Sequence, residues 1–303
     1  MPYQKTENPD TWCLNFDSNG VQSSAKIDLK GATVISWVVN GQEILFLSSK
    51  ADRTSKKAIR GGIPLVFPQF GKVESPNPVA TLPQHGFARI SQWKLDEENS
   101  SEASEFISVS FSLDSSDLKE QHSDLAESWA YPFTLTYTVC LSAFSLSTTL
   151  KVCTTSEKEL PITPLLHSYF ATEDITQTFI SGVKKGPFVD KTKSGAPTQE
   201  FSGEKIIISQ EVDEIHFDAF GSDKVSLNFG SSVPYKLEFN SIELPDVVVW
   251  NPWIEKCIAT QDLKDDDYLK FICVELGNIK KPFLLSSNSP LTFGQRISLV
   301  KVE

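Results

Sequence analysis

Residues 133–141 read Phe-Thr-Leu-Thr-Tyr-Thr-Val-Cys-Leu, and residues 144–152 read Phe-Ser-Leu-Ser-Thr-Thr-Leu-Lys-Val. Apolar and polar residues alternate in both stretches, and β-branched and aromatic side chains are frequent, which indicates β-strands. Only Ser142 and Ala143 separate the two, so we expect an antiparallel hairpin with one buried and one wet face. Residues 107–113 show the same alternation and add a third strand.

Strands are expected along the rest of the chain as well. The patterns predict them at 31–39, 43–47, 205–210, 225–229, 235–244, 247–250, 271–276 and 297–300. The runs 247–250 and 271–274 are apolar without alternation, which predicts burial on both faces. One short surface helix is expected over 117–129, and loops over 74–83 and 181–203. Since no repeat or linker is visible, we expect one all-β antiparallel sandwich domain over residues 1–303.

Composition narrows the class of protein. The 303 residues are 40% apolar and include 20 Phe and 6 Trp, enough for a large core. A net charge of −11 argues against a nucleic-acid or anionic-membrane partner. No signal peptide or membrane-spanning run is visible, and the five cysteines form no CxxC pair. We therefore expect a cytoplasmic monomer with reduced thiols and without metal or cofactor.

Two short islands indicate a binding site. Residues 60–71 read RGGIPLVFPQFG, and residues 82–89 read LPQHGFAR. Each combines rigid Gly and Pro with an arginine and aromatic rings, which suits a preformed pocket for a small anionic ligand. Arg60 and Arg89 have the planar donor fork that binds phosphate or carboxylate. The alternative is that both are surface arginines in ordinary ion pairs.

Three titratable residues are candidates for chemistry. His85 lies between Pro83 and Gly86, where a loop side chain is expected to face a pocket. His167, taken alone, is explained as well by a hydrogen-bonded histidine in the core. Glu275 ends an apolar run, and a buried carboxylate is costly unless it is paired or used. Burial would raise its pKa and make it a better base, whereas the simpler alternative is pairing with Lys or Arg.

Trp250 ends an apolar strand, and Trp253 follows it. An indole in such a position can cover the C–H face of a sugar ring. Packing explains Trp253 equally well. The acidic run 262–267 is expected to be a solvated loop, because its spacing does not fit a calcium loop. No GxGxxG, P-loop, HExxH or GxSxG motif occurs, so nucleotide binding and a nucleophilic serine have no support.

Five segments taken in order, RGGIPLVFPQFG, LPQHGFAR, LLHSYF, VVVWNP and FICVELG, resemble the aldose 1-epimerase superfamily, in its hexose-6-phosphate mutarotase branch. The resemblance runs from about residue 15 to residue 300. It implies a galactose-mutarotase-like antiparallel β-supersandwich. It also implies an isomerase that interconverts the α and β anomers of glucose 6-phosphate by acid–base ring opening, without a cofactor.

The resemblance assigns roles to the residues singled out above. His167 matches the acid and Glu275 the base. Substrate contacts are implied for Arg60, Gln84, His85, Arg89 and Asp213, with the two arginines on the phosphate. Trp250 stays a candidate for the sugar ring on the position of its indole alone. Whether Asp213 or Asp218 contacts the sugar is left open, as is the role of His85.

The chain also departs from its relatives. The Asn/Gly/His-rich loop of free-galactose mutarotases is missing, which puts free galactose in doubt as the substrate, and Leu276 follows Glu275 where Pro or Ala is more usual. Two other functions stay open. One is a catalytically silent carbohydrate-binding sandwich, and the other is an epimerase for a different anionic sugar.

Overall fold

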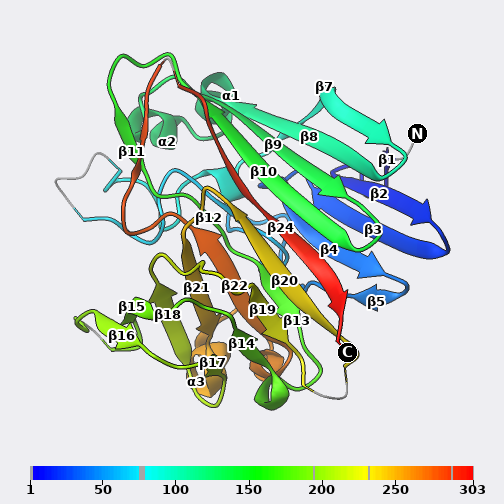
Figure 1. Cartoon of the computed structure of the whole chain (residues 1–303). Helices are drawn as coiled ribbons and strands as arrows, with labels where there is room; N and C mark the ends of the chain where they lie inside the picture. Colours follow the sequence, from blue (N-terminus) through cyan, green and yellow to red (C-terminus); the bar gives the residue numbers. More distant parts are fainter. Residues whose placement is uncertain (1–2, 75–78, 194, 231–232, 288, 303) are drawn as a thin grey trace.

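A computed structural model describes residues 3–302 of the chain except 75–78, 194, 231–232 and 288. Nearly all of its regular structure is β-sheet, and every pairing between its named strands is antiparallel (Figure 1). The largest sheet has nine strands in the order β17 (Lys205–Ile207), β14 (Phe179–Ser181), β19 (Val225–Asn228), β20 (Tyr235–Ile242), β24 (Leu291–Lys301), β10 (Ser145–Cys153), β9 (Thr134–Leu141), β8 (Phe106–Asp114) and β7 (Lys94–Ala103).

A second sheet carries the candidate site. Its strand order is β16 (Gln199–Phe201), β15 (Gly186–Asp190), β18 (Val212–His216), β21 (Asp246–Asn251), β22 (Phe271–Gly277), β12 (Leu165–Leu166) and β6 (Leu65–Val66), with β13 (Tyr169–Ala171) also paired to β22. We call it the eight-stranded sheet.

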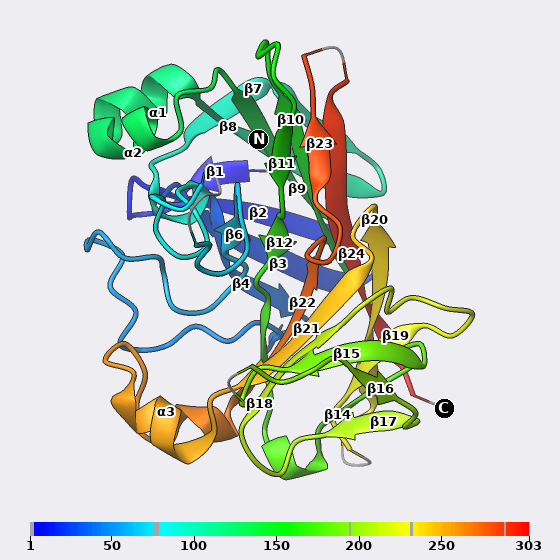
Figure 2. The same cartoon turned by 90° about the vertical axis from the view of Figure 1, so that its left-hand side faces the viewer.

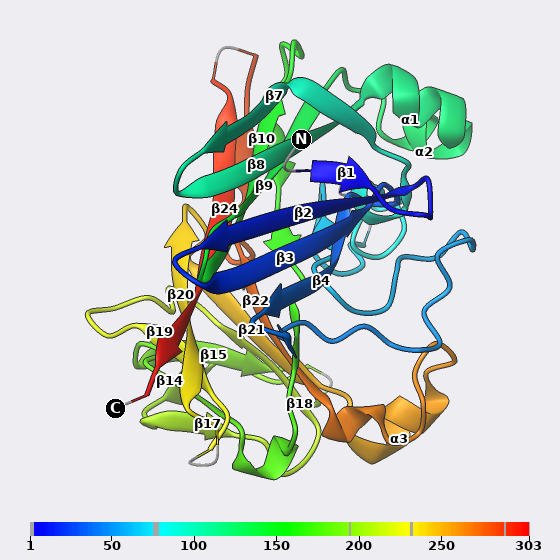
Figure 3. The same cartoon turned by 90° about the vertical axis from the view of Figure 1, so that its right-hand side faces the viewer.

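Two smaller sheets complete the fold. Five strands pair in chain order, namely β1 (Tyr3–Lys5), β2 (Thr11–Ser18), β3 (Val21–Asp28), β4 (Thr33–Val39) and β5 (Gln42–Glu43). They run across one side of the nine-stranded sheet (Figure 3). The strands β11 (Leu160–Ile162) and β23 (Phe283–Leu285) form a separate pair.

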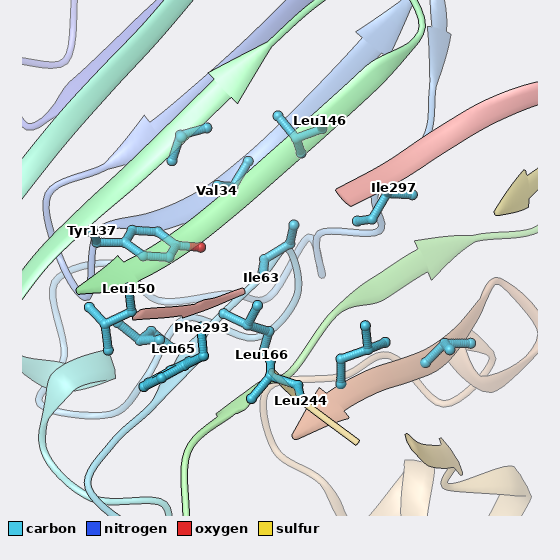
Figure 4. Close-up of a cluster of buried hydrophobic side chains, with 14 of the residues drawn as sticks. Val34, Ile63, Leu65, Tyr137, Leu146, Leu150, Leu166, Leu244, Phe293 and Ile297 are labelled. Carbon is cyan, nitrogen blue, oxygen red and sulfur yellow. The ribbon is translucent and has the colours of Figure 1, made fainter. Parts of the chain in front are cut away.

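The predicted hairpin is present as β9 and β10, with Leu141 opposite Leu146 and Leu135 opposite Val152. Alternate side chains of both strands are buried, as the period of two requires. They join one continuous core that the facing sheets share. Figure 4 shows part of this core, with Val34, Ile63, Leu65, Tyr137, Leu146, Leu150, Leu166, Leu244, Phe293 and Ile297. The all-β fold class is therefore confirmed, whereas a single domain over residues 1–303 stays a prediction.

The apolar runs in β21 and β22 are buried on both faces, as predicted. Val247 and Val249 point into the shared core together with Ile272 and Val274. The intervening side chains point to the other face of the sheet, because successive residues of a strand alternate. This second face of β21 and β22 carries the candidate site.

One polar contact joins the two large sheets inside the core. Gln295 of β24 donates from Nε2 to Oγ of Ser168 over 2.9 Å, and both side chains are fully buried. Ser168 lies between β12 and β13, directly between His167 and Tyr169. The central strand of one sheet therefore holds the backbone on which these two rings of the other sheet are mounted.

The structure corrects several predictions about local structure. The strand expected at 43–47 is only the short β5, followed by isolated bridges at Leu45 and Leu47. The expected helix at 117–129 is a pair of short helices, α1 (Ser115–Gln121) and α2 (Ser123–Ser128), and Asp114 caps the first. A further helix, α3 (Trp253–Ala259), was not predicted. The stretch 181–203 is not one loop, since it contains β15 and β16, which pair with each other.

Three single turns of 3-10 helix complete the elements: η1 (Ala88–Ile90), η2 (Ile175–Gln177) and η3 (Asp267–Leu269). Within the described residues, no helix combines the length and apolar character that crossing a membrane requires.

Candidate active site

A cavity of about 310 Å³ opens on the outer face of the eight-stranded sheet. The long connection between β5 and η1 reaches it from one side, between α1–α2 and α3 (Figure 2). We call it the first cavity. Its lining residues are Arg60, Phe70, Gln84, His85, Arg89, His167, Lys191, Asp213, Val248, Trp250, Lys256 and Glu275. All eight residues that the sequence analysis proposed for the site are among them.

The strand register explains how distant residues meet in the first cavity. Glu275 on β22 pairs with Val248 on β21, and Trp250 on β21 pairs with Asp213 on β18. Paired residues point to the same face of a sheet. Three strands that are remote in sequence therefore present a carboxylate, an indole and a second carboxylate to one cavity.

Two glycines hold the loops that supply the other half of the cavity. Gly62 has a φ of +68°, and a Cβ there would lie 2.1 Å from the carbonyl oxygen of Val34. Gly86 has a φ of +71°, and a Cβ there would lie 2.0 Å from the carbonyl oxygen of Phe67. Only glycine combines this backbone conformation with such close approach. Gly62, two residues after Arg60, and Gly86, next to His85, are thus required by packing.

His167 and Glu275 face each other at the base of the cavity. Nδ1 of His167 lies 3.3 Å from Oε1 of Glu275, and the two residues are 9% and 2% exposed. Neither Nδ1 nor Oε2 has a hydrogen-bond partner among the described residues. Long or poorly aligned contacts are common in catalytic sites without substrate. No Lys or Arg forms an ion pair with Glu275 in the described part of the chain. The structure therefore does not support the simpler alternative, in which Glu275 only neutralises a basic side chain.

Burial shifts the pKa of both groups. It raises the pKa of Glu275 well above its usual value, and the Asp213 carboxylate acts in the same direction. Burial also lowers the pKa of His167 well below its usual value, assisted by His85 and by both arginines. The ionised carboxylate is thus a stronger base, and the protonated imidazole a stronger acid, than the same groups in water.

His85 is held as a neutral ring. The backbone N–H of Gly71 donates to its Nδ1 over 3.1 Å. Burial, followed by the positive charge of Arg89, lowers the pKa of His85 to about 3. Because Nδ1 accepts a bond, the ring proton belongs on Nε2. The nearest group to Nε2 is the side-chain amide of Gln84, 3.2 Å away, which accepts this proton when it turns its oxygen toward the ring. With a pKa of about 3, the ring stays neutral over the neutral pH range.

The two arginines have different surroundings. Arg60 donates from Nε to Oδ1 of Asp262 over 3.0 Å and from Nη1 to the hydroxyl of Tyr169 over 3.0 Å. Arg89 donates to the carbonyl oxygen of Gln84, but within the described chain it has no carboxylate partner and its Nε is buried without a bond. Burial lowers the pKa of Arg89 to about 10, so the guanidinium stays charged near neutral pH.

Tyr169 connects the arginine side of the cavity with His167. Its ring is stacked on the imidazole, with centroids 4.8 Å apart and planes at 6°. Trp250 meets both rings edge-on, at 5.9 Å from His167 and 6.1 Å from Tyr169. The acid candidate is thus packed between two aromatic rings that restrict its rotation.

The positions of Asp213 and Asp218 show which of the two can contact a ligand in the first cavity. Asp213 lines the first cavity, where its Oδ1 lies 3.4 Å from Nζ of Lys191. Asp218 is exposed outside this cavity and lies 3.7 Å from Nζ of Lys280. Asp213 is therefore the aspartate placed for contact with a ligand in the first cavity.

Sequence reasoning missed several residues of the site. Tyr169 and Phe70 lie inside quoted motifs but received no role, whereas Lys191 lies in the stretch taken for a loop. The prediction of a solvated acidic loop at 262–267 was wrong for both ends, since Asp262 binds Arg60 and Asp267 is buried. No local pattern marks a carboxylate whose partner lies 202 residues away.

One set of potential metal donors is present in the described residues. The donor atoms of His167, Cys273 and Glu275 all lie within 4.8 Å of one another. Bonds of 2.0–2.3 Å in a tetrahedral zinc site keep donor atoms within about 3.8 Å of one another. The three groups are therefore spread more widely than a formed zinc site requires.

Comparison with known proteins agrees with this arrangement. A family model described as aldose 1-epimerase matches residues 17–298. Two curated relatives, both named "Putative glucose-6-phosphate 1-epimerase", come from Cenchrus ciliaris and Salmonella typhimurium. The first is 32% identical over 86% of this chain and 77% of its own length, and the second is 30% identical over 92% and 88%.

Solved structures share the fold. A crystal structure from Salmonella typhimurium, described as a "putative mutarotase", superimposes with a TM-score of 0.81 at 25% identity and covers 99% of this chain and 93% of its own. A galactose 1-epimerase from Lactobacillus acidophilus gives a TM-score of 0.70 at 15% identity, over 100% and 98% of the two chains, which shows the fold alone. The predicted mutarotase-like β-supersandwich is confirmed.

Proposed function

Because this chain belongs to the aldose 1-epimerase family, we propose that it is an isomerase that interconverts the α and β anomers of glucose 6-phosphate and related hexose 6-phosphates. The observation that carries the choice of a phosphorylated sugar is Arg89. Arg89 is half-buried, its Nε has no hydrogen-bond partner and its guanidinium has no carboxylate partner among the described residues, which favours a bound anion in the same cavity as the His167–Glu275 pair.

The chemistry is acid–base ring opening. Glu275 takes the proton of the anomeric hydroxyl while His167 gives a proton to the ring oxygen, and the C1–O5 bond breaks to leave an open-chain aldehyde. Rotation about C1–C2 presents the other face of the carbonyl. On closure Glu275 returns its proton to the carbonyl oxygen and His167 recovers one from the attacking hydroxyl. The sugar ends as the other anomer, and both side chains regain their starting protonation.

The pKa shifts act on these two roles in opposite ways. The active form has an ionised Glu275 and a protonated His167; the pKa shift of each group makes it more reactive in that form and also makes that form less populated before substrate binds. Neither nucleophile nor metal enters any step. We assign hydroxyl contacts to Asp213, His85 and Gln84, and a flat contact with the sugar ring to Trp250.

The experiment that tests the function follows pure α-glucose 6-phosphate to anomeric equilibrium by NMR exchange, with free glucose and free galactose measured alongside. Faster equilibration of the phosphorylated sugar, beyond any effect on the free hexoses, is the expected result. Binding of the sugar phosphate without acceleration of any sugar would instead indicate a catalytically silent binding protein. Acceleration only of a sugar with a carboxylate would move the substrate to another anionic class.

We also propose that the protein acts as a monomeric single domain in the cytoplasm and takes no nucleic-acid partner. The net charge of −11 disfavours polyanions. Sedimentation analysis at the concentration used for turnover checks the monomer, and a dimer would contradict it. Limited proteolysis checks the single domain, and stable separate fragments would contradict it.

A further inference from the structure

His167 and Glu275 lie opposite each other on neighbouring segments of the eight-stranded sheet. The strands β12 and β13 pair with β22 in one continuous register, which places His167 opposite Glu275 and Ser168 opposite Val274. Residues paired in this way point to the same face of a sheet. The separation of the two groups proposed to move protons therefore depends on the path of the backbone at residue 167.

The backbone bends at His167. The N–H of Val274 donates to the carbonyl oxygen of Ser168 over 3.2 Å, as in a regular antiparallel pair. The two residues of such a pair normally exchange both hydrogen bonds. The N–H of Ser168 instead donates to the carbonyl oxygen of Leu166 over 3.0 Å, which closes a three-residue γ-turn centred on His167. The direction in which the imidazole leaves the backbone is therefore set by this turn.

Gln295 of β24 is placed to hold the turn. Its Nε2 donates to Oγ of Ser168 over 2.9 Å, and the same Oγ lies 3.5 Å from the carbonyl oxygen of Leu166 that closes the turn. In the part of the chain that the structure describes, the side chain of Gln295 makes no other hydrogen bond, and its Oε1 is buried without a partner. One hydrogen bond thus connects the central strand of the nine-stranded sheet with the turn.

Stability does not explain why a glutamine stands at this position. Phe293 and Ile297, on the same face of β24, lie in the apolar core (Figure 4), and Gln295 is fully buried between them. A buried carboxamide oxygen without a partner destabilises the folded state, and an apolar side chain of similar volume would avoid this cost. The hydrogen bond to Ser168 is the one contact that an apolar side chain could not provide.

We propose that Gln295 is a positioning residue for proton transfer, because it holds the γ-turn that sets the distance and angle between the His167 imidazole and the Glu275 carboxylate. Gln295 does not line the first cavity, so it acts through Ser168 and not by contact with the substrate. This inference rests on the proposed function, since it names a residue that supports the proposed acid.

The test compares Gln295→Met with the matched variant Thr148→Val. Met is close to Gln in length but cannot form the hydrogen bond to Ser168. Thr148 lies opposite Gln295 on β10 and is fully buried, and its hydroxyl has no partner among the described residues. Gln295→Met should lower kcat for glucose 6-phosphate about 10–100-fold and change KM less than about twofold, because a small misplacement of a reacting group slows the chemical step. Thr148→Val should leave both constants within about twofold, because it removes a polar group from the same part of the core without affecting the turn.

Ser168→Ala and the double variant Gln295→Met/Ser168→Ala separate positioning from folding. Each single variant removes the same hydrogen bond, so each should lower kcat by a similar factor, and the double variant should lower it no further. Neither partner of the bond remains in the double variant, so urea unfolding should find it at least as stable as the wild-type protein. Losses of kcat that multiply in the double variant, or that follow a loss of stability across the series, would overturn the proposal.

Histidine-selective NMR keeps the inference separate from the proposed function. The chain has four histidines, so the imidazole signals of His167 can be assigned by their loss in His167→Asn. Gln295→Met should shift these signals and leave those of His122 and His216 in place, whereas Thr148→Val should shift none of them. If no sugar is turned over by the wild-type protein but the His167 signals shift as expected, the proposed function fails and Gln295 stands as the residue that orients the ring. If Gln295→Met has normal turnover and unchanged His167 signals, the positioning role fails and the proposed function stands.

Discussion

The phenol ring of Tyr169 lies flat against the imidazole of His167, with 4.8 Å between the ring centroids and 6° between the planes. The hydroxyl of the same phenol accepts a hydrogen bond from Arg60. One side chain therefore contacts both the proposed acid and a proposed phosphate ligand. An anion that binds Arg60 can influence the position of His167 without touching it.

Replacing Tyr169 by Phe separates these two contacts, because it removes the hydroxyl and keeps the stacked ring. We expect the preference for glucose 6-phosphate over free glucose in kcat/KM to fall about tenfold, as Arg60 loses one of its two hydrogen-bonding partners. Tyr169→Leu, which removes the stack as well, should also lower kcat for both sugars. If Tyr169→Phe leaves the preference unchanged, the hydroxyl has no part in positioning Arg60.

Glu275→Gln should lower kcat by about 10²–10⁴-fold, because the amide cannot accept the anomeric proton. The fold should survive, since Gln fills the same volume and avoids burying a charge. NMR exchange measures the rate, and circular dichroism with thermal unfolding serves as the control for folding. Turnover close to that of the wild-type protein would remove Glu275 from the role of base.

Arg89→Ala should raise KM for glucose 6-phosphate about 10–100-fold, the size expected for loss of a charge-assisted hydrogen bond in a shielded site. Arg89→Lys keeps the charge but loses the planar fork, so it should fall between the two proteins. Steady-state kinetics with glucose 6-phosphate and free glucose provide the comparison. An equal loss on both sugars would contradict a role in binding phosphate.

Acid should destabilise the protein through His85. Its folded-state pKa is about 3, below the usual 6.5, so the folded state binds fewer protons than the unfolded state between these values. This contribution to stability is complete above pH 6.5 and is lost as the pH falls toward 3, at about 1.4 kcal/mol per pH unit. His167, whose pKa is also lowered, acts in the same direction.

Urea unfolding at pH 7 and pH 5 measures this effect, and His85→Asn should reduce the difference between the two free energies by about 2 kcal/mol. Glu275→Gln tests the opposite pH dependence of stability, which is expected for a group whose pKa is raised in the folded state. The raised pKa of Glu275 makes its contribution to stability largest at low pH, and this contribution is lost as the pH rises through that pKa. The variant should therefore gain stability relative to the wild-type protein as the pH rises. An unchanged difference in His85→Asn would mean that His85 takes up a proton in the folded state without cost.

Gly86→Ala should lower the free energy of unfolding by about 3 kcal/mol or more, because its Cβ would meet the carbonyl oxygen of Phe67 in addition to the strain of a positive φ. Gly20→Ala is the matched control. Gly20 has a φ of +77° but nothing within 4 Å of its Cβ position, so only the backbone strain applies, about 1 kcal/mol. Equal losses in the two variants would show that the loop before Phe87 shifts without cost.

The sequence predicts those parts of the fold in which one face of a strand is buried. The alternation at 133–141 and 144–152 gives β9 and β10 directly. By contrast, β7 (Lys94–Ala103) is exposed on both faces and shows no such alternation. β12 and β13 have two and three residues, too few to reveal a period.

The residues of the site also differ in how far the sequence alone reveals them. Arg60, His85 and Arg89 stand beside Gly and Pro, whose backbone demands are visible in sequence. Lys191 and Asp262 are placed only by contacts with distant residues, namely Asp213 and Arg60. Such contacts leave no local pattern, so they became apparent only in three dimensions.

The bond from Gln295 to Ser168 has a consequence for how this scaffold can change. Of the pair proposed to move protons, Glu275 lies on β22 and His167 directly follows β12, and the backbone beside His167 is tied to the opposite sheet. The residues proposed to recognise the anion, Arg60 and Arg89, lie outside the long strands, on the connection between β5 and η1 or in η1 itself. Recognition of the anion and proton transfer thus depend on different segments of the backbone. New substrates can be selected by altering this connection, while the geometry for proton transfer is inherited unchanged.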